Sequence, residues 1–313
     1  MKLLVINNLS SGYGEGAVYD FMRSFARDGD EVCLRCTDGE TEVASLLKDA
    51  TDCDVVVASG GDGTVAAVCY ELRNTGVPVM PFPAGTANLL ILNLHSPVET
   101  HPLSIMAREG KLLDFDMGEI EVGGTSYGFS LMAGAGYDAD IMKRAKPFKR
   151  VWGPMAYFSA AVSNFIPQQS HFTIDIDGTR HERDGVCVLA VNFSKIQFDI
   201  PVTHDNLPRD GKLELVVLKA QNALELVPAI LAAIMDRDGE FPERGDAMEV
   251  FSGREITVDA DPPLEVQYDG ETTGIMTPFT ARILDGAARF VVSDEAYDLF
   301  TKPLLEEASN EGA

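Results

Sequence analysis

The sequence lacks a hydrophobic run long enough to span a bilayer. Its longest nearly uncharged apolar segment, residues 223–235, contains Glu225 and Pro228 and falls short of the roughly 20 apolar residues that a transmembrane helix needs. Residues 1–9 contain only a short apolar run and no small-residue cleavage site, so we expect no signal peptide. The sequence therefore predicts a soluble protein of the cytoplasm, and its 313 residues suffice for two domains.

Basic residues are also scarce. The chain has 25 Lys and Arg residues against 49 Asp and Glu residues, which gives a formal net charge of −24. We therefore expect no nucleic acid partner, because a surface that binds phosphate backbones is usually basic. For the same reason, contact with an anionic membrane would have to use a local basic patch.

Cysteine and histidine patterns exclude several kinds of site. The five cysteines are odd in number and form no disulfide framework, and the five histidines are scattered. Cys33 and Cys36 have C-x-x-C spacing, but they belong to a strand-like run, in which residues three apart face opposite sides. The chain also lacks a G-x-x-x-x-G-K-[ST] loop, an H-E-x-x-H motif, a G-x-S-x-G motif and a protein-kinase H-R-D set. Zinc chemistry, a Ser-His-Asp hydrolase and a P-loop enzyme are thus not expected.

A glycine-rich loop is the feature around which the chain is organised. Val55 to Val57 reads as a buried strand, Gly60-Gly61-Asp62-Gly63-Thr64 follows, and Val65 to Leu72 suits a helix. Glycines let backbone N–H groups approach a ligand, and a helix N-terminus attracts anions. A carboxylate in such a loop indicates nucleotide phosphates with Mg²⁺. The alternative is a plain strand-to-helix turn with an Asp at the helix start.

A second loop of the same kind favours the anion site. Val77 to Phe82 reads as the next strand, and Pro83-Ala84-Gly85-Thr86-Ala87-Asn88 leads into an apolar helix at Leu89 to Leu94. In an open α/β sheet, both loops would lie at the carboxyl ends of neighbouring strands, which is where ligands bind.

These paired loops resemble the diacylglycerol kinase catalytic domain of soluble bacterial lipid kinases. That family is related to sphingosine and ceramide kinases and, more distantly, to NAD kinases. The resemblance implies ATP as phosphate donor, with Mg²⁺ bridging its phosphates to Asp62. It also implies a set of nucleotide-binding residues in the loops and in the turns after the first two strands, namely Asn7, Ser10, Thr37, Gly60, Gly61, Asp62, Gly63, Thr64, Gly85, Thr86 and Asn88.

Two of the positions in the early turns have a second interpretation. Asn8 stands where family members usually carry the proline of Asn-Pro-x-Ser-Gly-x-Gly, and we expect it to loosen the turn more than to change its chemistry. Thr37 lies near the nucleotide by resemblance, but it is equally suited to be the N-cap of a helix predicted at Glu40 to Lys48.

The pattern of elements predicts two domains. Strands alternate with helices over 1–110, which predicts an α/β domain with a doubly wound parallel sheet of the NAD kinase and diacylglycerol kinase kind. Over 111–289, strand-like segments separated by turn signals predict a mainly antiparallel β-sandwich, with Ser126 to Ala133 as one strand. By the family's pattern, a C-terminal helix at about 290–307 returns to the first domain.

The resemblance places the rest of the active site in the second domain. Asp269-Gly270-Glu271 follows a strand-like segment, and it resembles the Asp-Gly-Glu of the family. Asp269 is then the catalytic base toward the lipid hydroxyl, and Glu271 a supporting carboxylate or metal partner. The alternative is an ordinary Asp-Gly turn.

A structural Mg²⁺ site is expected by resemblance at Asp210 and at the backbone carbonyl of Lys212. The chain has Leu207 where the family would supply another Asp, although Asp205 lies nearby. This departure weakens the expectation of a bound structural metal.

Residues 143–152 combine five basic residues with Phe148 and the one Trp of the chain. The segment is interpreted either as a solvated helix end or as a patch that contacts the inner face of a membrane. Family members can form dimers, so a homodimer is a further expected partner.

The sequence thus predicts an ATP-dependent lipid kinase with its nucleotide in the cleft between two domains. Diacylglycerol is the default acceptor, and a sphingoid base, ceramide or another lipid alcohol fits the motifs equally well. The alternatives are an enzyme of the NAD kinase type and a catalytically silent regulator that binds a nucleotide or a lipid.

Overall fold

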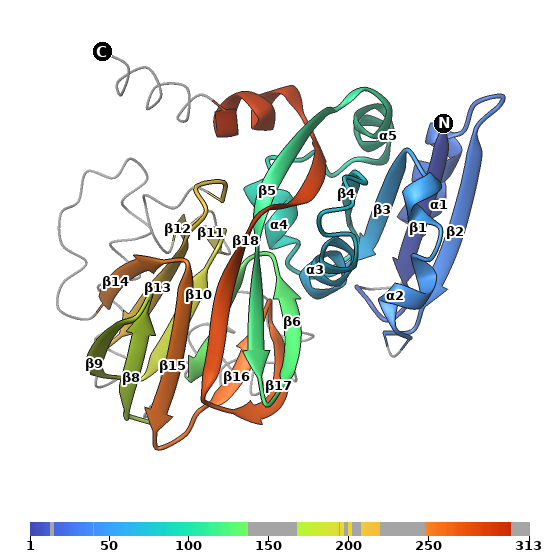
Figure 1. Ribbon diagram of the computed structural model, residues 1–313. Helices are drawn as coiled ribbons and strands as arrows, with labels where there is room; N and C mark the ends of the chain where they lie inside the picture. The colour runs from blue at the N-terminus through green and yellow to red at the C-terminus, as the bar shows by residue number, and fades with distance from the viewer. Residues whose placement is uncertain are drawn as a thin grey trace, which may run out of the picture. The chain divides into compact units, whose positions relative to one another are not determined.

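The computed structural model describes residues 1–12, 16–39, 41–136, 168–193, 195–196, 200–201, 208–219 and 248–301. The chain divides into two compact units (Figure 1). One contains Met1–Met117 with the described residues of 207–210 and 284–313, and the other contains 118–206 and 211–283. The chain passes between the units within strands β5 (Lys111–Val122) and β18 (Phe279–Val292).

The first unit is built on a parallel sheet. Its strands lie in the order β2, β1, β3, β4, and the end of β18 pairs in parallel with β4 through Phe290 and Val79. The strands are β1 (Lys2–Asn8), β2 (Glu31–Thr37), β3 (Val55–Gly60) and β4 (Val79–Pro83). The helical segments are α1 (Ala17–Phe25), α2 (Val43–Leu46), η1 (Ala50–Asp52), α3 (Asp62–Glu71), α4 (Leu89–Asn93) and α5 (Thr100–Glu109), followed by a helix at 294–301.

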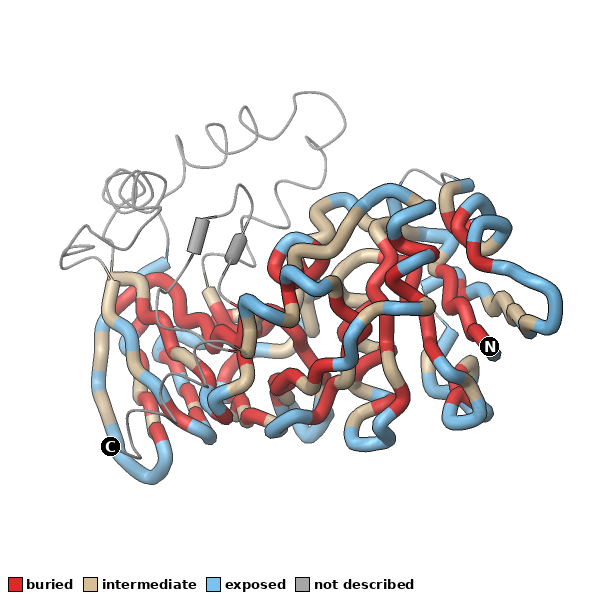
Figure 2. The backbone as a smooth tube through the Cα atoms, turned by 90° about the horizontal axis from the view of Figure 1, so that it is seen from above, coloured by how far each residue is buried: buried red, intermediate tan, exposed pale blue. Residues whose placement is uncertain are grey.

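Helices cover this sheet as its hydrophobic pattern requires. Leu3 and Val5 of β1 pack in one core cluster with Phe21 of α1 and with residues of α5. Alternate residues of a strand face opposite sides, and Leu4 and Ile6 are also fully buried. In Figure 2 the backbone next to the marked N-terminus is accordingly coloured mainly as buried. The α/β fold with a doubly wound parallel sheet predicted from the sequence is therefore confirmed.

The second unit is an antiparallel β-sandwich, which also confirms the prediction. One sheet has six strands in the order β14, β13, β10, β7, β16, β17. The other contains β18, β15, β8 and β9, and β5 pairs with β6 and β18. The strands not yet given are β6 (Thr125–Phe129), β7 (Met132–Gly136), β8 (Ser170–Ile176), β9 (Thr179–Gly185), β10 (Cys187–Val191), β11 (Lys195–Ile196), β12 (Ile200–Pro201), β13 (Leu213–Leu218), β14 (Met248–Gly253), β15 (Glu255–Asp261), β16 (Glu265–Tyr268) and β17 (Glu271–Met276).

Side chains from both sheets fill one core in this unit. Phe129 and Val258 belong to one sheet, Val188 and Val266 belong to the other, and all four lie in the same buried cluster. Buried residues alternate with more exposed ones along β8 and β15, which is the pattern expected of a sandwich.

Two predicted elements differ in the structure. The segment Ser126 to Ala133 is not one strand but two, β6 and β7, because the chain is interrupted at Ser130 and Leu131. The helix predicted at Glu40 to Lys48 is reduced to α2, whose N-cap is Glu42 rather than Thr37. In the part of the chain that the structure describes, no helix is both long enough and apolar enough to cross a membrane.

Candidate functional site

The register of the parallel sheet brings the predicted loops to one edge. Asn8 pairs with Thr37, Asn7 pairs with Ser59, and Gly60 pairs with Pro83. Three connections therefore begin side by side, because the strands run in the same direction. They are the turn at 8–12 after β1, the loop at 60–64 between β3 and α3, and the loop at 83–88 between β4 and α4.

The loop at 60–64 ends in an open helix start. Helix α3 begins at Asp62, and its N-cap, Gly61, has an extended backbone and makes no side-chain capping hydrogen bond. Because the first N–H groups of a helix have no partner within it, this end of α3 is suited to bind an anion.

Asp62 connects the two glycine loops. Its carboxylate Oδ1 accepts a hydrogen bond of 2.9 Å from the backbone N–H of Leu90, which lies in the first turn of α4. Asp62 and Leu90 are 28 residues apart, so no local pattern in the sequence could have indicated this contact. The predicted role of Asp62 toward Mg²⁺ stays a prediction.

The loop at 83–88 packs directly on the first loop. A Cβ atom added to Gly85 would lie only 2.5 Å from the Cα of Gly61, so this position accepts no larger residue without a shift of backbone. Asn88 holds the loop from within, since its Oδ1 accepts from the Gly85 N–H at 2.8 Å and its Nδ2 donates to the Gly85 carbonyl at 3.1 Å. Asn88 itself has a left-handed backbone with φ of 52°, and Thr86 is exposed.

The turn at 8–12 contacts both loops. The Gly61 N–H donates to Ser11 Oγ at 3.2 Å, and the Asn8 side chain donates to Thr64 Oγ1 at 2.9 Å. Gly12 has a positive φ of 62°, and a Cβ atom there would lie 2.4 Å from the Ala84 carbonyl oxygen. The three segments are thus interlocked by hydrogen bonds and close packing.

The other predicted contacts of the early turns are local. Ser10 donates from its hydroxyl to the carbonyl of Asp38. Thr37 is buried, and its Oγ1 accepts from the Gly39 N–H at 3.0 Å, so it stabilises its own turn rather than capping a helix.

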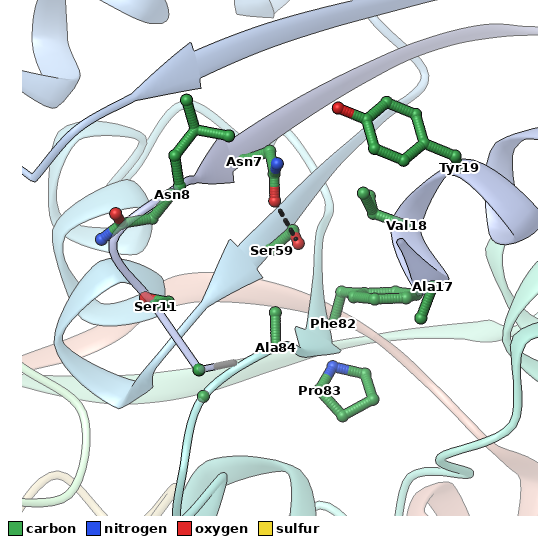
Figure 3. Close-up of a pocket in the computed structure, with 13 residues that line it drawn as sticks. Asn7, Asn8, Ser11, Ala17, Val18, Tyr19, Ser59, Phe82, Pro83 and Ala84 are labelled. Carbon is green, nitrogen blue, oxygen red and sulfur yellow. Dashed lines mark hydrogen bonds between the residues drawn. The ribbon is translucent and has the colours of Figure 1, made fainter. Parts of the chain in front are cut away.

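A small cavity of about 200 Å³ opens beside this edge of the sheet (Figure 3). Asn7 is 8% exposed, lines the cavity, and accepts a hydrogen bond of 2.8 Å from Ser59 Oγ. Tyr19 and Phe82 also contribute to the wall. All the described residues that line it are uncharged, and they include residues of the turn at 8–12 and of the loop at 83–88.

In the second unit, Asp269 occupies the tip of the hairpin between β16 and β17. Its backbone is left-handed with φ of 41°, and Gly270 follows with φ of 81°. Tyr268 pairs with Glu271 across this two-residue turn, and the exposed Glu271 extends from the start of β17. The Asp-Gly turn predicted as the alternative is therefore present, and the Asp269 carboxylate also binds backbone N–H groups of another segment.

The carboxylate of Asp269 binds the break between β6 and β7. It accepts hydrogen bonds from the backbone N–H groups of Ser130, Leu131 and Met132 at 2.7, 2.9 and 2.9 Å. These N–H groups are engaged by the carboxylate, which accounts for the interruption of the predicted strand. Three backbone donors therefore hold the Asp269 carboxylate in place.

Tyr268 lies next to this turn and stacks on Tyr127, with ring centroids 4.9 Å apart. Burial raises the pKa of the Tyr268 hydroxyl, and the nearby Tyr127, Glu271 and Asp269 raise that pKa further. The phenol is therefore a neutral hydrogen-bond donor at physiological pH.

Candidate metal ligands were also predicted. Asp210 and Lys212 are exposed, and the carbonyl of Gly211 between them accepts from Arg254 at 2.8 Å. Over the described ranges, no group of three or more His, Cys, Asp or Glu side chains is arranged to hold a metal ion. Asp205, Leu207 and the basic segment 143–152 lie outside the described residues.

One carboxylate beside an anion-binding helix start is nevertheless suited to one kind of metal complex. Mg²⁺ is commonly held by one or two carboxylates together with the phosphates of a nucleotide, and not by a cage of protein ligands. Asp62 at the start of α3 carries a carboxylate of this kind, and its role toward Mg²⁺ stays a prediction.

Two known families match this chain. Residues 2–120 match the diacylglycerol kinase catalytic domain, and residues 132–292 match the YegS C-terminal NAD kinase beta sandwich-like domain. The second match alone covers more than half of the chain.

Similar proteins agree with these matches. A Staphylococcus epidermidis protein named "Putative lipid kinase" is 24% identical over 307 residues, which cover 93% of this chain and 94% of that protein. A Synechocystis protein named "Uncharacterized protein" is 26% identical over 273 residues, and the chain spans only 59% of its length while 80% of the chain is aligned.

Solved structures of low identity share the fold. A Bacillus anthracis structure described as a diacylglycerol kinase has a TM-score of 0.68 at 18% identity and covers 94% of this chain and 98% of that chain. The structure of an Archaeoglobus fulgidus NAD kinase in complex with ATP has a TM-score of 0.56 at 14% identity. The match covers 96% of this chain and 97% of that chain. The parallel-sheet unit, the sandwich unit and both family matches lead to one conclusion: the chain belongs to the diacylglycerol kinase catalytic-domain family and carries the YegS type of C-terminal domain.

Proposed function

We propose that this protein is an ATP-dependent lipid kinase, which transfers the γ-phosphate of ATP to the hydroxyl of diacylglycerol or a related lipid alcohol. The observation that carries the proposal is the interlocked set of three connections at one edge of the parallel sheet. The turn at 8–12 binds the loop at 60–64 through Ser11 and Asn8, and Asp62 ties that loop to the start of α4.

The nucleotide phosphates would bind at the open start of α3. The backbone N–H groups there and the positive end of the helix dipole favour an anion. The contact of Gly85 with Gly61 holds both loops close enough for one polyphosphate to touch them together. Mg²⁺, when bound with the nucleotide beside Asp62, supplies positive charge to the phosphates.

The transfer step forms a bond between the lipid hydroxyl oxygen and the γ-phosphorus. The bond from that phosphorus to the bridging β–γ oxygen breaks, ADP leaves, and the hydroxyl proton passes to a base. We assign the base to Asp269, with Glu271 as a supporting carboxylate. Phosphoryl transfer depends mainly on positioning and on charge stabilisation, so the base has to orient the hydroxyl more than to be strong.

An enzyme of the NAD kinase type is the second candidate. The likeness to the Archaeoglobus NAD kinase, with its TM-score of 0.56, favours it through the fold alone. A silent regulator that binds nucleotide without turnover is a third outcome that one experiment can separate from the others.

The experiment is phosphate transfer from labelled ATP with Mg²⁺ by the purified protein. Diacylglycerol, a sphingoid base and ceramide are offered in mixed micelles, beside NAD and a sample without acceptor. We expect a labelled lipid, and we expect the label to be lost in Asp269→Asn. Labelling of NAD instead would contradict the lipid kinase, and ATP binding without any labelled product would favour the regulator.

The Asp269→Asn variant needs a structural control, because Asp269 also accepts three backbone hydrogen bonds. Asn keeps one oxygen acceptor but turns an NH₂ group toward a backbone N–H, so the 130–132 segment loses part of its support. Hydrogen exchange of the 130–132 amides measures this loss separately from activity, because an amide that loses its hydrogen bond is less protected. Retention of full activity by Asp269→Asn would refute the assignment of the base.

A further inference from the structure

Asn8 makes two hydrogen bonds that fix the orientation of its side-chain amide. Its Oδ1 accepts from the backbone N–H of Ser10 at 2.9 Å, and its Nδ2 donates to Thr64 Oγ1 at 2.9 Å. A backbone N–H can only donate, so the amide oxygen has to face Ser10. The NH₂ group therefore has to face Thr64.

This orientation determines what the Thr64 hydroxyl can do. An amide NH₂ group has no acceptor, so Thr64 Oγ1 accepts this bond and its own single proton is directed elsewhere. No acceptor for that proton is found among the residues that the structure describes. Thr64 belongs to the first turn of α3, whose N-cap makes no side-chain capping bond.

The Thr64 hydroxyl thus lies in the first turn of α3, at the end of the helix where the dipole favours an anion. A negatively charged oxygen acceptor is the ligand that satisfies both the Thr64 hydroxyl proton and the positive end of the helix dipole. A neighbouring side chain that donates to Thr64 leaves the Thr64 proton available for an anion and so strengthens anion binding. A neighbouring side chain that accepts from Thr64 would take up that proton.

We propose that Asn8 is a positioning residue of the nucleotide site, which holds the Thr64 hydroxyl as a hydrogen-bond donor to a phosphate oxygen of ATP. This inference rests on the proposed function. Asn8 does not touch the phosphate itself, and its effect is exerted through Thr64.

The first test is a double-mutant cycle on Mg-ATP binding, measured by calorimetry with Asn8→Ala, Thr64→Val and the double variant. Loss of one neutral hydrogen bond weakens binding by about three- to tenfold, and we expect this for Asn8→Ala. In the Thr64→Val background, Asn8→Ala should weaken binding no further, because the donor that it positions is already gone. Full multiplication of the two single effects would overturn the inference.

The second test reverses the direction of the hydrogen bond. Asn8→Asp keeps an oxygen for the Ser10 N–H but places a second oxygen against Thr64, which must then donate to Asp and not to ATP. Leu9→Asp is the matched control, since Leu9 is a neighbour in the same turn and is 60% exposed. An Asp at this position adds the same charge without a hydrogen bond to Thr64.

We expect Asn8→Asp to raise the KM for ATP more than Leu9→Asp does, with the excess absent when Thr64 is Val. Equal effects of the two Asp variants in both backgrounds would contradict the inference. If Asn8→Ala fails to fold, Asn8→Asp carries the test because it keeps the bond to Ser10. Absence of ATP binding by the wild-type protein would refute the proposed function and this inference together, whereas wild-type binding with multiplying effects would refute the inference alone.

Discussion

Asp62 has two roles in this account, and two substitutions separate them. Its Oδ1 accepts from the Leu90 N–H at 2.9 Å, which is a contact of the kind made by helix-capping side chains. Its negative charge is the proposed partner of Mg²⁺. Asp62→Asn keeps an oxygen acceptor and removes the charge, whereas Asp62→Ala removes both.

The size of the structural effect follows from the hydrogen bond. Replacing a helix-capping side chain by Ala costs about 1 kcal/mol, which corresponds to roughly a fivefold change in an equilibrium constant. The Leu90 N–H lies at the first turn of α4. We therefore expect the exchange of this amide with deuterium to accelerate about fivefold in Asp62→Ala and to change little in Asp62→Asn.

The assay combines hydrogen exchange, followed by mass spectrometry of peptides that cover α4, with calorimetric titration of ATP in the presence and absence of Mg²⁺. We expect both variants to lose the Mg²⁺-dependent part of ATP affinity. Exchange at Leu90 in Asp62→Asn as fast as in Asp62→Ala would refute the capping role. Unchanged Mg²⁺-dependent affinity in Asp62→Asn would refute the metal role.

Gly85, His171 and the basic segment 143–152 each give a further prediction. Gly85→Ala should destabilise the first unit by about 1–3 kcal/mol and abolish ATP binding, because the new Cβ would lie 2.5 Å from the Gly61 Cα. Urea unfolding measures the loss of stability and calorimetry measures ATP binding. An ATP affinity equal to that of the wild-type protein would contradict the prediction. His171 forms ion pairs with Asp184 and Glu182 at 2.8 and 2.9 Å, and these carboxylates raise the pKa of His171 above its ordinary value of 6.5. The ion pairs therefore stabilise the fold fully below pH 6.5, and this stability is lost as pH rises through the raised pKa. His171→Gln should lower the free energy of unfolding more at pH 6 than at pH 9, and equal losses would contradict the role of the ion pairs. Replacing the basic residues of 143–152 by Gln should reduce binding to anionic vesicles in a sedimentation assay, and unchanged binding would remove that segment as the membrane contact.

The local part of the candidate site could be predicted from the sequence. An apolar strand-like run, then a glycine loop and then an apolar helical segment indicate a strand, a loop and a helix, and the two loops occur where that pattern predicts. The strand ends then align because parallel strands share one direction, as the pairing of Gly60 with Pro83 shows.

The contacts that link distant residues could not be predicted in this way. Asn8 binds Thr64 at a separation of 56 residues, and Asp269 binds Ser130 at a separation of 139. The second contact divides a strand that the apolar pattern alone presents as continuous. The apolar pattern could not predict strand β9 either, because its sequence TRHERDG is almost entirely polar and carries no hydrophobic alternation.

Transfer of labelled phosphate from Mg-ATP to a lipid alcohol tests the proposed lipid kinase activity, and it is measured with the wild-type protein and with Asp62→Asn. We expect a labelled lipid product with the wild-type protein. We expect that product to be lost in the variant while the Leu90 amide stays protected. Labelling of NAD but of no lipid, or equal lipid labelling by both proteins, would contradict it.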